Sequence, residues 1–225
     1  MGAGQKIKGV KFVSVNLQKG QKVSLSKGNP GLSRIVVGLG WDEAKPVSTG
    51  GFFGSLFSAA PQTIDCDAFA IMLRGGRLVS RQDVVYFNNL THFTGAVKHM
   101  GDNLTGAGDG DDEQIVIDLQ RVPMEYDRIV IAVNIYQAHQ KNQHFGMISN
   151  AFIRIVNAAT NREMLRYDLT ENYGGMTAMV FGEVYRHNGE WKFNAIGSGT
   201  RDGSVGDLAE RYENPKQGFN TKQGY

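Results

Sequence analysis

The chain consists of short apolar runs that are separated by turn-forming residues. The runs at 34–39 (RIVVGL), 115–119 (IVIDL) and 129–136 (IVIAVNIY) are rich in β-branched and aromatic residues, and Gly, Asn, Asp or Pro residues bound them. This pattern is typical of β-strands. It predicts strands at residues 10–15, 22–26, 34–39, 67–73, 84–87, 115–119, 129–136, 151–156, 165–169, 176–185 and 191–196.

Two parts of this pattern resemble each other. Residues 34–39 followed by 68–71 parallel residues 128–133 followed by 151–155. We infer an internal duplication, because two similar halves suit the paired sheets of a sandwich. The expected fold is therefore an all-β, two-sheet β-sandwich with internal duplication and long acidic loops at one edge.

The predicted domain covers residues 1–200, of which 1–14 form an N-terminal extension. Residues 201–225 are expected to form a short helix, at 205–212, and a polar tail with too few apolar residues to pack. A Phe-rich run at 50–57 has two interpretations: a surface that contacts a membrane or a partner, or side chains that fold back on the core.

Candidate chemistry is concentrated between residues 101 and 118, where six carboxylates occur without any Lys or Arg. Two carboxylates about 4 Å apart repel by roughly 4 kcal/mol at an effective dielectric near 20, so such a cluster favours a bound cation. Calcium suits it best, because this ion accepts six to eight oxygen ligands in loose geometry. The segment is too compressed for an EF-hand loop, and a solvated acidic loop is the alternative.

A second pair of acids, Asp65 and Asp67, precedes the apolar run 68–73. Positions i and i+2 of a strand face the same way, so the two carboxylates project together, whereas Cys66 faces the other side and is expected to be a buried small hydrophobe. Two calcium ions are expected. The predicted metal ligands are Asp65, Asp67, Asp102, Asn103, Asp109, Asp111, Asp112 and Glu113.

Composition excludes several other classes of protein. The net charge of +2 and the absence of a basic stripe argue against nucleic-acid binding. One cysteine cannot form an internal disulfide, which favours a reducing compartment. No signal core or run of 18 apolar residues occurs, so we expect a cytoplasmic protein that does not span a membrane.

Seven ordered motifs give the chain a specific resemblance over roughly residues 15–200. They are 22–27 (KVSLSK), 37–42 (VGLGWD), 65–68 (DCDA), 99–106 (HMGDNLTG), 108–113 (GDGDDE), 149–154 (SNAFIR) and 185–193 (YRHNGEWKF). In these motifs the chain resembles the TerD family of tellurium-resistance and general stress proteins. The Gly/Phe-rich insertion before Asp65 is more similar to the TerZ-like branch.

The resemblance implies a calcium-binding β-sandwich that works with other Ter-family proteins or with a membrane-associated stress complex. We therefore expect a non-catalytic protein in which Ca²⁺ orders an acidic loop edge that mediates partner association. Two alternatives remain open: an enzyme that uses the acids and Mg²⁺ for phosphoryl transfer or hydrolysis, and a structural assembly module. The enzyme would lack a phosphate-cradling Gly-Lys-Ser/Thr loop.

Overall fold

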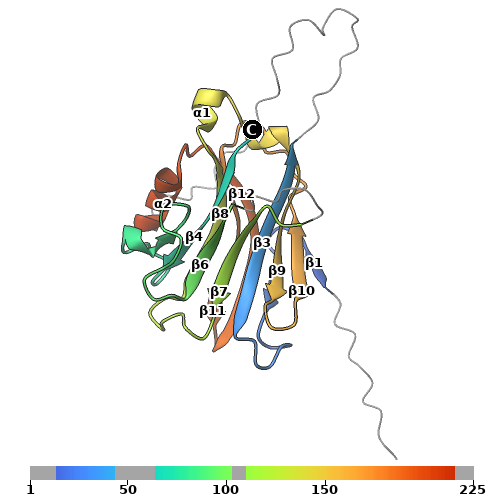
Figure 1. Ribbon diagram of the computed structural model, residues 1–225, viewed down its shortest axis with the longest axis vertical. Coiled ribbons are helices and arrows are strands. Elements are labelled where there is room, and N and C mark those ends of the chain that lie inside the picture. Colours follow the sequence, from blue (N-terminus) through green and yellow to red (C-terminus); the bar gives the residue numbers. More distant parts are fainter. Residues whose placement is uncertain (1–13, 44–63, 103–109, 216–225) are drawn as a thin grey trace, which may run out of the picture.

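The apolar runs of the sequence form two six-stranded sheets that pack face to face (Figure 1). The computed structural model describes residues 14–43, 64–102 and 110–215. The predicted positions at 10–13 and the Phe-rich run 50–57 lie outside these ranges. Within the described part, the expected two-sheet β-sandwich is confirmed.

The first sheet contains, in spatial order, β1 (Val15–Leu17), β10 (Arg162–Asp168), β9 (Ile148–Asn157), β3 (Arg34–Glu43), β7 (Glu113–Asp118) and β6 (Val97–Asp102). The second sheet contains, in spatial order, β2 (Lys22–Ser24), β12 (Glu190–Thr200), β11 (Ala178–His187), β8 (Arg128–Ile135), β4 (Cys66–Leu73) and β5 (Val84–Val85). Neighbouring strands are antiparallel, except that β1 runs parallel to β10. Sequence order and spatial order differ, so strands of both halves contribute to each sheet.

Strand pairing links the two halves that the sequence comparison pointed out. In the first half β3 is followed by β4, and in the second half β8 is followed by β9. In the structure β3 pairs with β9, and β4 pairs with β8. Each half thus exchanges its second strand with the other, an arrangement that suits an internal duplication.

Alternation along the strands creates two apolar layers. On β4, Ala68 and Ala70 lie in the core between the sheets, whereas Phe69 and Ile71 lie on the outer face of the second sheet. The outer layer is covered by helix α2 (Val205–Glu213), which contributes Leu208, Ala209 and Tyr212. The helix, which the sequence placed beyond residue 200, therefore packs onto the same folded unit as the sandwich (Figure 1).

One strand and three short helical turns of the described residues were not predicted. β6 carries the sequence VKHMGD, in which only Val97 is a strong apolar residue on the inner face and the other inward position is the buried His99. The alternation of apolar and polar residues that predicts a strand is therefore weak in β6, because one of its two inward positions is polar. Helix α1 (Ala138–Lys141) and the 3₁₀ turns at Arg81–Asp83 and Phe145–Met147 lie between the predicted strands. No helix in the described ranges is long and apolar enough to cross a membrane.

Replacement of Leu208 by Ala tests whether α2 belongs to the core. The side chain is fully buried in the outer apolar layer, so Leu208→Ala is expected to lower the free energy of unfolding by about 3 kcal/mol in denaturant titration. Glu210→Ala on the exposed face of the same helix is the control, and it should cost less than about 1 kcal/mol. Equal stability of Leu208→Ala and the wild type would place the helix outside the cooperative unit.

Candidate metal centre at the acidic rim

Four strand ends meet at one end of the sandwich. β3 and β6 end there, whereas β4 and β7 begin there: Leu39 is paired with Glu113, and Glu113 is paired with Asp102. We call this end the acidic rim and define it by Asp42, Asp65, Asp102 and residues 111–113. The strand ends bring acids from distant parts of the sequence together.

Glu113 points into the space between the sheets. Its carboxylate accepts a hydrogen bond from the backbone N–H of Ala68 and lies 3.6 Å from Nε2 of His99. His99 Nδ1 accepts the N–H of Gly101 at 3.0 Å, so Nε2 carries the hydrogen and donates to the Ala68 carbonyl at 3.1 Å. Glu113 is 4 % exposed. Its carboxylate therefore joins the first sheet to β4 of the second.

Asp111 points to the outer face of the first sheet. Arg154 on β9 donates to both of its oxygens, at 2.6 and 3.1 Å, and Gln114 Nε2 donates at 3.0 Å. The carboxylate lies directly over Gly38, where an added Cβ would come within 2.2 Å of it. Charge repulsion at this residue is thus relieved by an arginine that is distant in sequence.

Asp112 and Asp65 lie at the rim itself. The N–H of Asp112 donates to Leu39, and its Oδ2 accepts from Trp41 N–H at 2.7 Å. Burial raises the pKa of Asp112, the bond from Trp41 opposes the shift, and the charges of Asp42 and Asp111 raise the pKa further. Asp65 is exposed. Asp42 is exposed as well and accepts from Asn150 Nδ2 at 2.7 Å. Asp65, Asp112 and Asp42 therefore lie at the surface of the rim.

Asp67 faces away from this group. It pairs with Asn134 of β8, and both lie on the outer face of the second sheet, in line with Phe69 and Ala132. Asp65 precedes β4, which begins at Cys66, so the strand does not test the prediction that Asp65 and Asp67 project together.

Cys66 lies between these carboxylates and faces the core, as predicted. Burial raises the pKa of its thiol well above the ordinary value, and the charges of Glu113, Asp65, Asp67 and Asp112 raise it further. The thiol is therefore protonated at neutral pH, which makes it a poor nucleophile and a poor metal ligand.

The side chains of the predicted metal ligands point in several different directions. Within the described ranges, no three His, Cys, Asp or Glu side chains are arranged so that they could hold a metal ion. Asn103 and Asp109 lie outside those ranges, and Asp102 is described only as the last residue of β6.

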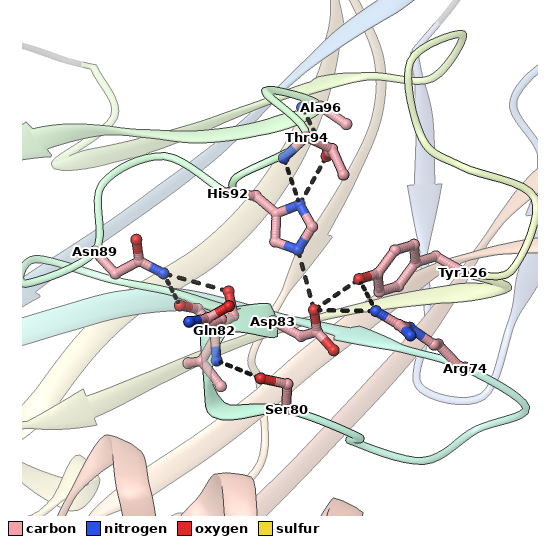
Figure 2. Close-up of polar contacts among 10 residues, drawn as sticks. Arg74, Ser80, Gln82, Asp83, Asn89, His92, Thr94, Ala96 and Tyr126 are labelled. Atoms are coloured by element: carbon pink, nitrogen blue, oxygen red, sulfur yellow. Dashed lines mark hydrogen bonds and ion pairs between the residues drawn. The ribbon is translucent and has the colours of Figure 1, made fainter.

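A further polar cluster, which the sequence did not reveal, lies at the edge of the second sheet, next to β5 (Figure 2). The fully buried Asp83 accepts from the Tyr126 hydroxyl at 2.7 Å, lies 3.2 Å from His92 Nε2 and is 3.7 Å from Arg74. His92 Nδ1 accepts the Thr94 N–H at 3.4 Å, so Nε2 is the donor to Asp83. Asp83 and Tyr126 are 43 residues apart, which no local spacing shows. Through these contacts Asp83 holds together segments of the chain that are distant in sequence.

The fold and the rim together define a class of protein: an all-β sandwich with a carboxylate-rich end. The TerD domain family matches residues 13–212. The chain is 49% identical over 201 residues to Stress response protein SCP2 of Bacillus subtilis (strain 168), covering 89% of this chain and 100% of that protein. This chain belongs to the TerD domain family.

Other relatives agree with that assignment. Tellurium resistance protein TerD of Serratia marcescens is 48% identical over 199 residues, which is 88% of this chain and 97% of that protein. TerZ of the same organism is 40% identical over 195 residues, which is 86% and 94%, so these identities do not favour the TerZ-like branch. A crystal structure of a telluride resistance protein (TerD) homologue from Streptomyces coelicolor A3(2) shares the fold, with a TM-score of 0.54 at 24% identity over 76% of this chain and 92% of that one.

Two neighbouring acids are expected to respond in opposite ways to loss of charge. Asp111→Asn leaves Arg154 without its carboxylate partner and should lower the free energy of unfolding by about 2 kcal/mol. Asp112→Asn keeps an acceptor for Trp41 N–H but removes a carboxylate whose pKa is raised in the folded state. In metal-free buffer at neutral pH it should stabilise the protein by less than about 1 kcal/mol, because solvent screens the charge.

The pH dependence supplies the control for this pair. Because the folded pKa of Asp112 is above its unfolded value, ionisation disfavours folding, so the gain from Asp112→Asn should vanish as acid protonates the wild-type carboxyl. Denaturant titrations across the acid range would measure this. Destabilisation by Asp112→Asn at every pH would contradict the assignment.

Cys66 is expected to resist alkylation. In native protein at pH 8, iodoacetamide should modify it far more slowly than in urea-unfolded protein, because the thiol is buried and its pKa is raised. Mass spectrometry over time measures both rates. Similar rates in the two states would show that the side chain is accessible and its pKa ordinary.

Proposed function

We propose that this member of the tellurium-resistance and general stress protein family is a non-catalytic protein that binds Ca²⁺ at the acidic rim. The observation that carries the proposal is the meeting of the strand ends at the rim, where Asp112 is held by Trp41 N–H at 2.7 Å. Burial and the charges of Asp42 and Asp111 raise the pKa of this carboxyl. A divalent cation bound there would stabilise the charged form of this carboxylate. The attraction between the cation and the carboxylates would then offset the repulsion between the carboxylates.

The chemistry of the donors favours a hard cation. Carboxylate oxygens are preferred by Ca²⁺ and Mg²⁺, whereas Zn²⁺ and softer metals favour thiolate and imidazole. The Cys66 thiol is protonated and faces the core. His99 uses both ring nitrogens in hydrogen bonds to the backbone. The rim therefore offers oxygen ligands.

The contacts of the individual acids narrow the proposed ligand set. Asp111 is paired with Arg154, and Glu113 is bonded to Ala68 N–H, so these two residues support the rim from within. The proposed direct ligands are Asp65, Asp102, Asn103, Asp109 and Asp112. The number of acids in the sequence led us to expect two calcium ions. With Asp111 and Glu113 removed from the set of direct ligands, the remaining oxygens favour one ion.

We also propose that the bound ion controls association with a partner, either another Ter-family protein or a membrane-associated stress complex. The names of the relatives support a role in tellurium resistance and stress response. Neutralisation of the rim by Ca²⁺ would remove the electrostatic penalty for covering these carboxylates with a second protein. Association would then depend on calcium.

Metal titration tests the calcium proposal. At a hundredfold excess over Kd, Ca²⁺ should raise the free energy of unfolding by about 2.7 kcal/mol, and Mg²⁺ at equal concentration should not. The double variant Asp65→Asn, Asp112→Asn should lose this effect while folding normally in chelator. Calorimetry of the wild type counts the ions.

The matched control is Asp118→Asn, at the opposite end of the strand that begins with Glu113. Asp118 pairs with the exposed Arg34, so its loss should cost little and leave the calcium response intact. Equal melting of the wild type in calcium and in chelator would refute calcium binding. Partner capture from cell extract that is the same with calcium and with chelator would refute the calcium-controlled association.

A further inference from the structure

A separate cavity of about 280 Å³ opens on the outer face of the second sheet, next to the start of α2. It lies between the end of β8, the start of β4 and the residues that follow β5. Its polar and aromatic lining includes Asp67, Tyr86, Phe87, Asn134 and Tyr136, together with the first turn of α2. This size suits a small metabolite and not a drug-sized ligand.

Asn134 makes the cavity unusual. The residue is only 3 % exposed, and its Oδ1 has no hydrogen-bond partner within the described part of the chain. A buried amide oxygen without a donor is costly, because folding has removed its water without replacing the bond. Since Asn134 lines the cavity, a ligand with N–H groups can supply the missing donor.

One end of the cavity is thus rich in acceptors and negative charge. Asp67 is the cross-strand partner of Asn134 on the same face of the sheet, and side chains in that relation have Cβ atoms about 4.5–5.5 Å apart. A carboxylate beside an amide oxygen is the environment that an ammonium group needs, since three N–H donors can be shared between them.

The other end presents donors. α2 is nine residues long and begins after the N-cap Ser204, whose Oγ accepts the N–H of Asp207 at 3.2 Å. The N–H groups of Val205 and Gly206 have no acceptor within the helix, because the first turn of every helix lacks one. Val205 and Gly206 also line the cavity. The positive end of the helix dipole adds to this preference for an anionic group.

Aromatic rings form the remaining wall. Tyr86 and Phe87 pack edge to face with centroids 5.2 Å apart. Phe87 and Tyr136 are 43 % and 42 % exposed, so part of each ring is available for contact. Such rings can cover the apolar part of a small ligand.

We propose that this cavity binds a free α-amino acid, with the ammonium group at Asp67 and Asn134, the carboxylate at the first turn of α2, and the side chain against the aromatic wall. The juxtaposition of an acceptor end and a donor end selects a zwitterion over an amine or an acid alone. The site is distinct from the acidic rim, and the proposal does not depend on calcium.

The test is a thermal-shift screen of the full chain with the twenty amino acids in chelator, followed by calorimetry. An amino acid present at about ten times its Kd should raise Tm by about 3–6 °C. The best binder is then compared with its decarboxylated amine and its N-acetyl derivative. Each lacks one end of the zwitterion, and each should bind at least about tenfold more weakly. No shift with any amino acid, or equal binding of the truncated forms, would overturn the proposal.

Two variants test the two ends of the cavity. Asn134→Leu should abolish binding while leaving the Tm of the free protein unchanged or higher, because it removes an unpartnered buried amide. Val205→Pro removes one first-turn N–H, and the extended Ser204, with ψ at 165°, is compatible with a following proline. It should weaken the amino acid but not the amine.

Asp118→Asn, at the far end of the sandwich, is the control and should bind as the wild type does. If Asn134→Leu lowers the Tm of the free protein and retains binding, the side chain is structural and the proposal fails. The amino-acid titrations contain chelator, so a negative result in them does not affect the calcium proposal. Absence of calcium binding likewise does not affect the amino-acid proposal.

Discussion

The structure depends on how its buried carboxylates are compensated by hydrogen-bond donors and positive charges. Glu113 accepts from a backbone N–H of the facing sheet, Asp111 is paired with Arg154, and Oδ1 of Asp83 contacts Tyr126 and His92. An acid that had lost such a partner inside the sandwich would carry the full cost of its desolvation. These contacts explain why a chain with many acids near one end still folds into paired sheets.

Period-two alternation applies only from the first residue of each strand, and Asp65, Asp111 and Asp112 precede β4 and β7, so alternation does not decide where these acids point. Asp111, Asp112 and Glu113 are consecutive, yet they reach the outer face of the first sheet, the rim and the interior in turn. Asp65 and Asp67 lie one on the rim and one on the outer face of the second sheet, beside Asn134. Proximity in sequence therefore created an apparent single cluster, whereas the contacts of the individual acids divide it into separate roles.

The sequence was sufficient for most of the fold, because strands such as β3, β8 and β12 are marked by β-branched runs between turn residues. β6 was missed because its inner face carries His99, which is stabilised by bonds to Gly101 and Ala68 that no periodicity can show. The same limit applies to the site. The acids were identifiable from the sequence, but Arg154 as the partner of Asp111 and Asn134 as the neighbour of Asp67 arise only from strand pairing.

Cys66 determines which chemistry the rim can support. A thiol acts as nucleophile or soft-metal ligand only as the thiolate, and that form is opposed here both by burial and by four carboxylates. Relief of this charge by a cation would lower the pKa of the thiol, yet the side chain would still face the apolar core between the sheets. The oxygen atoms at the surface of the rim, and not the sulfur, are therefore the groups through which this end of the protein can interact with ions.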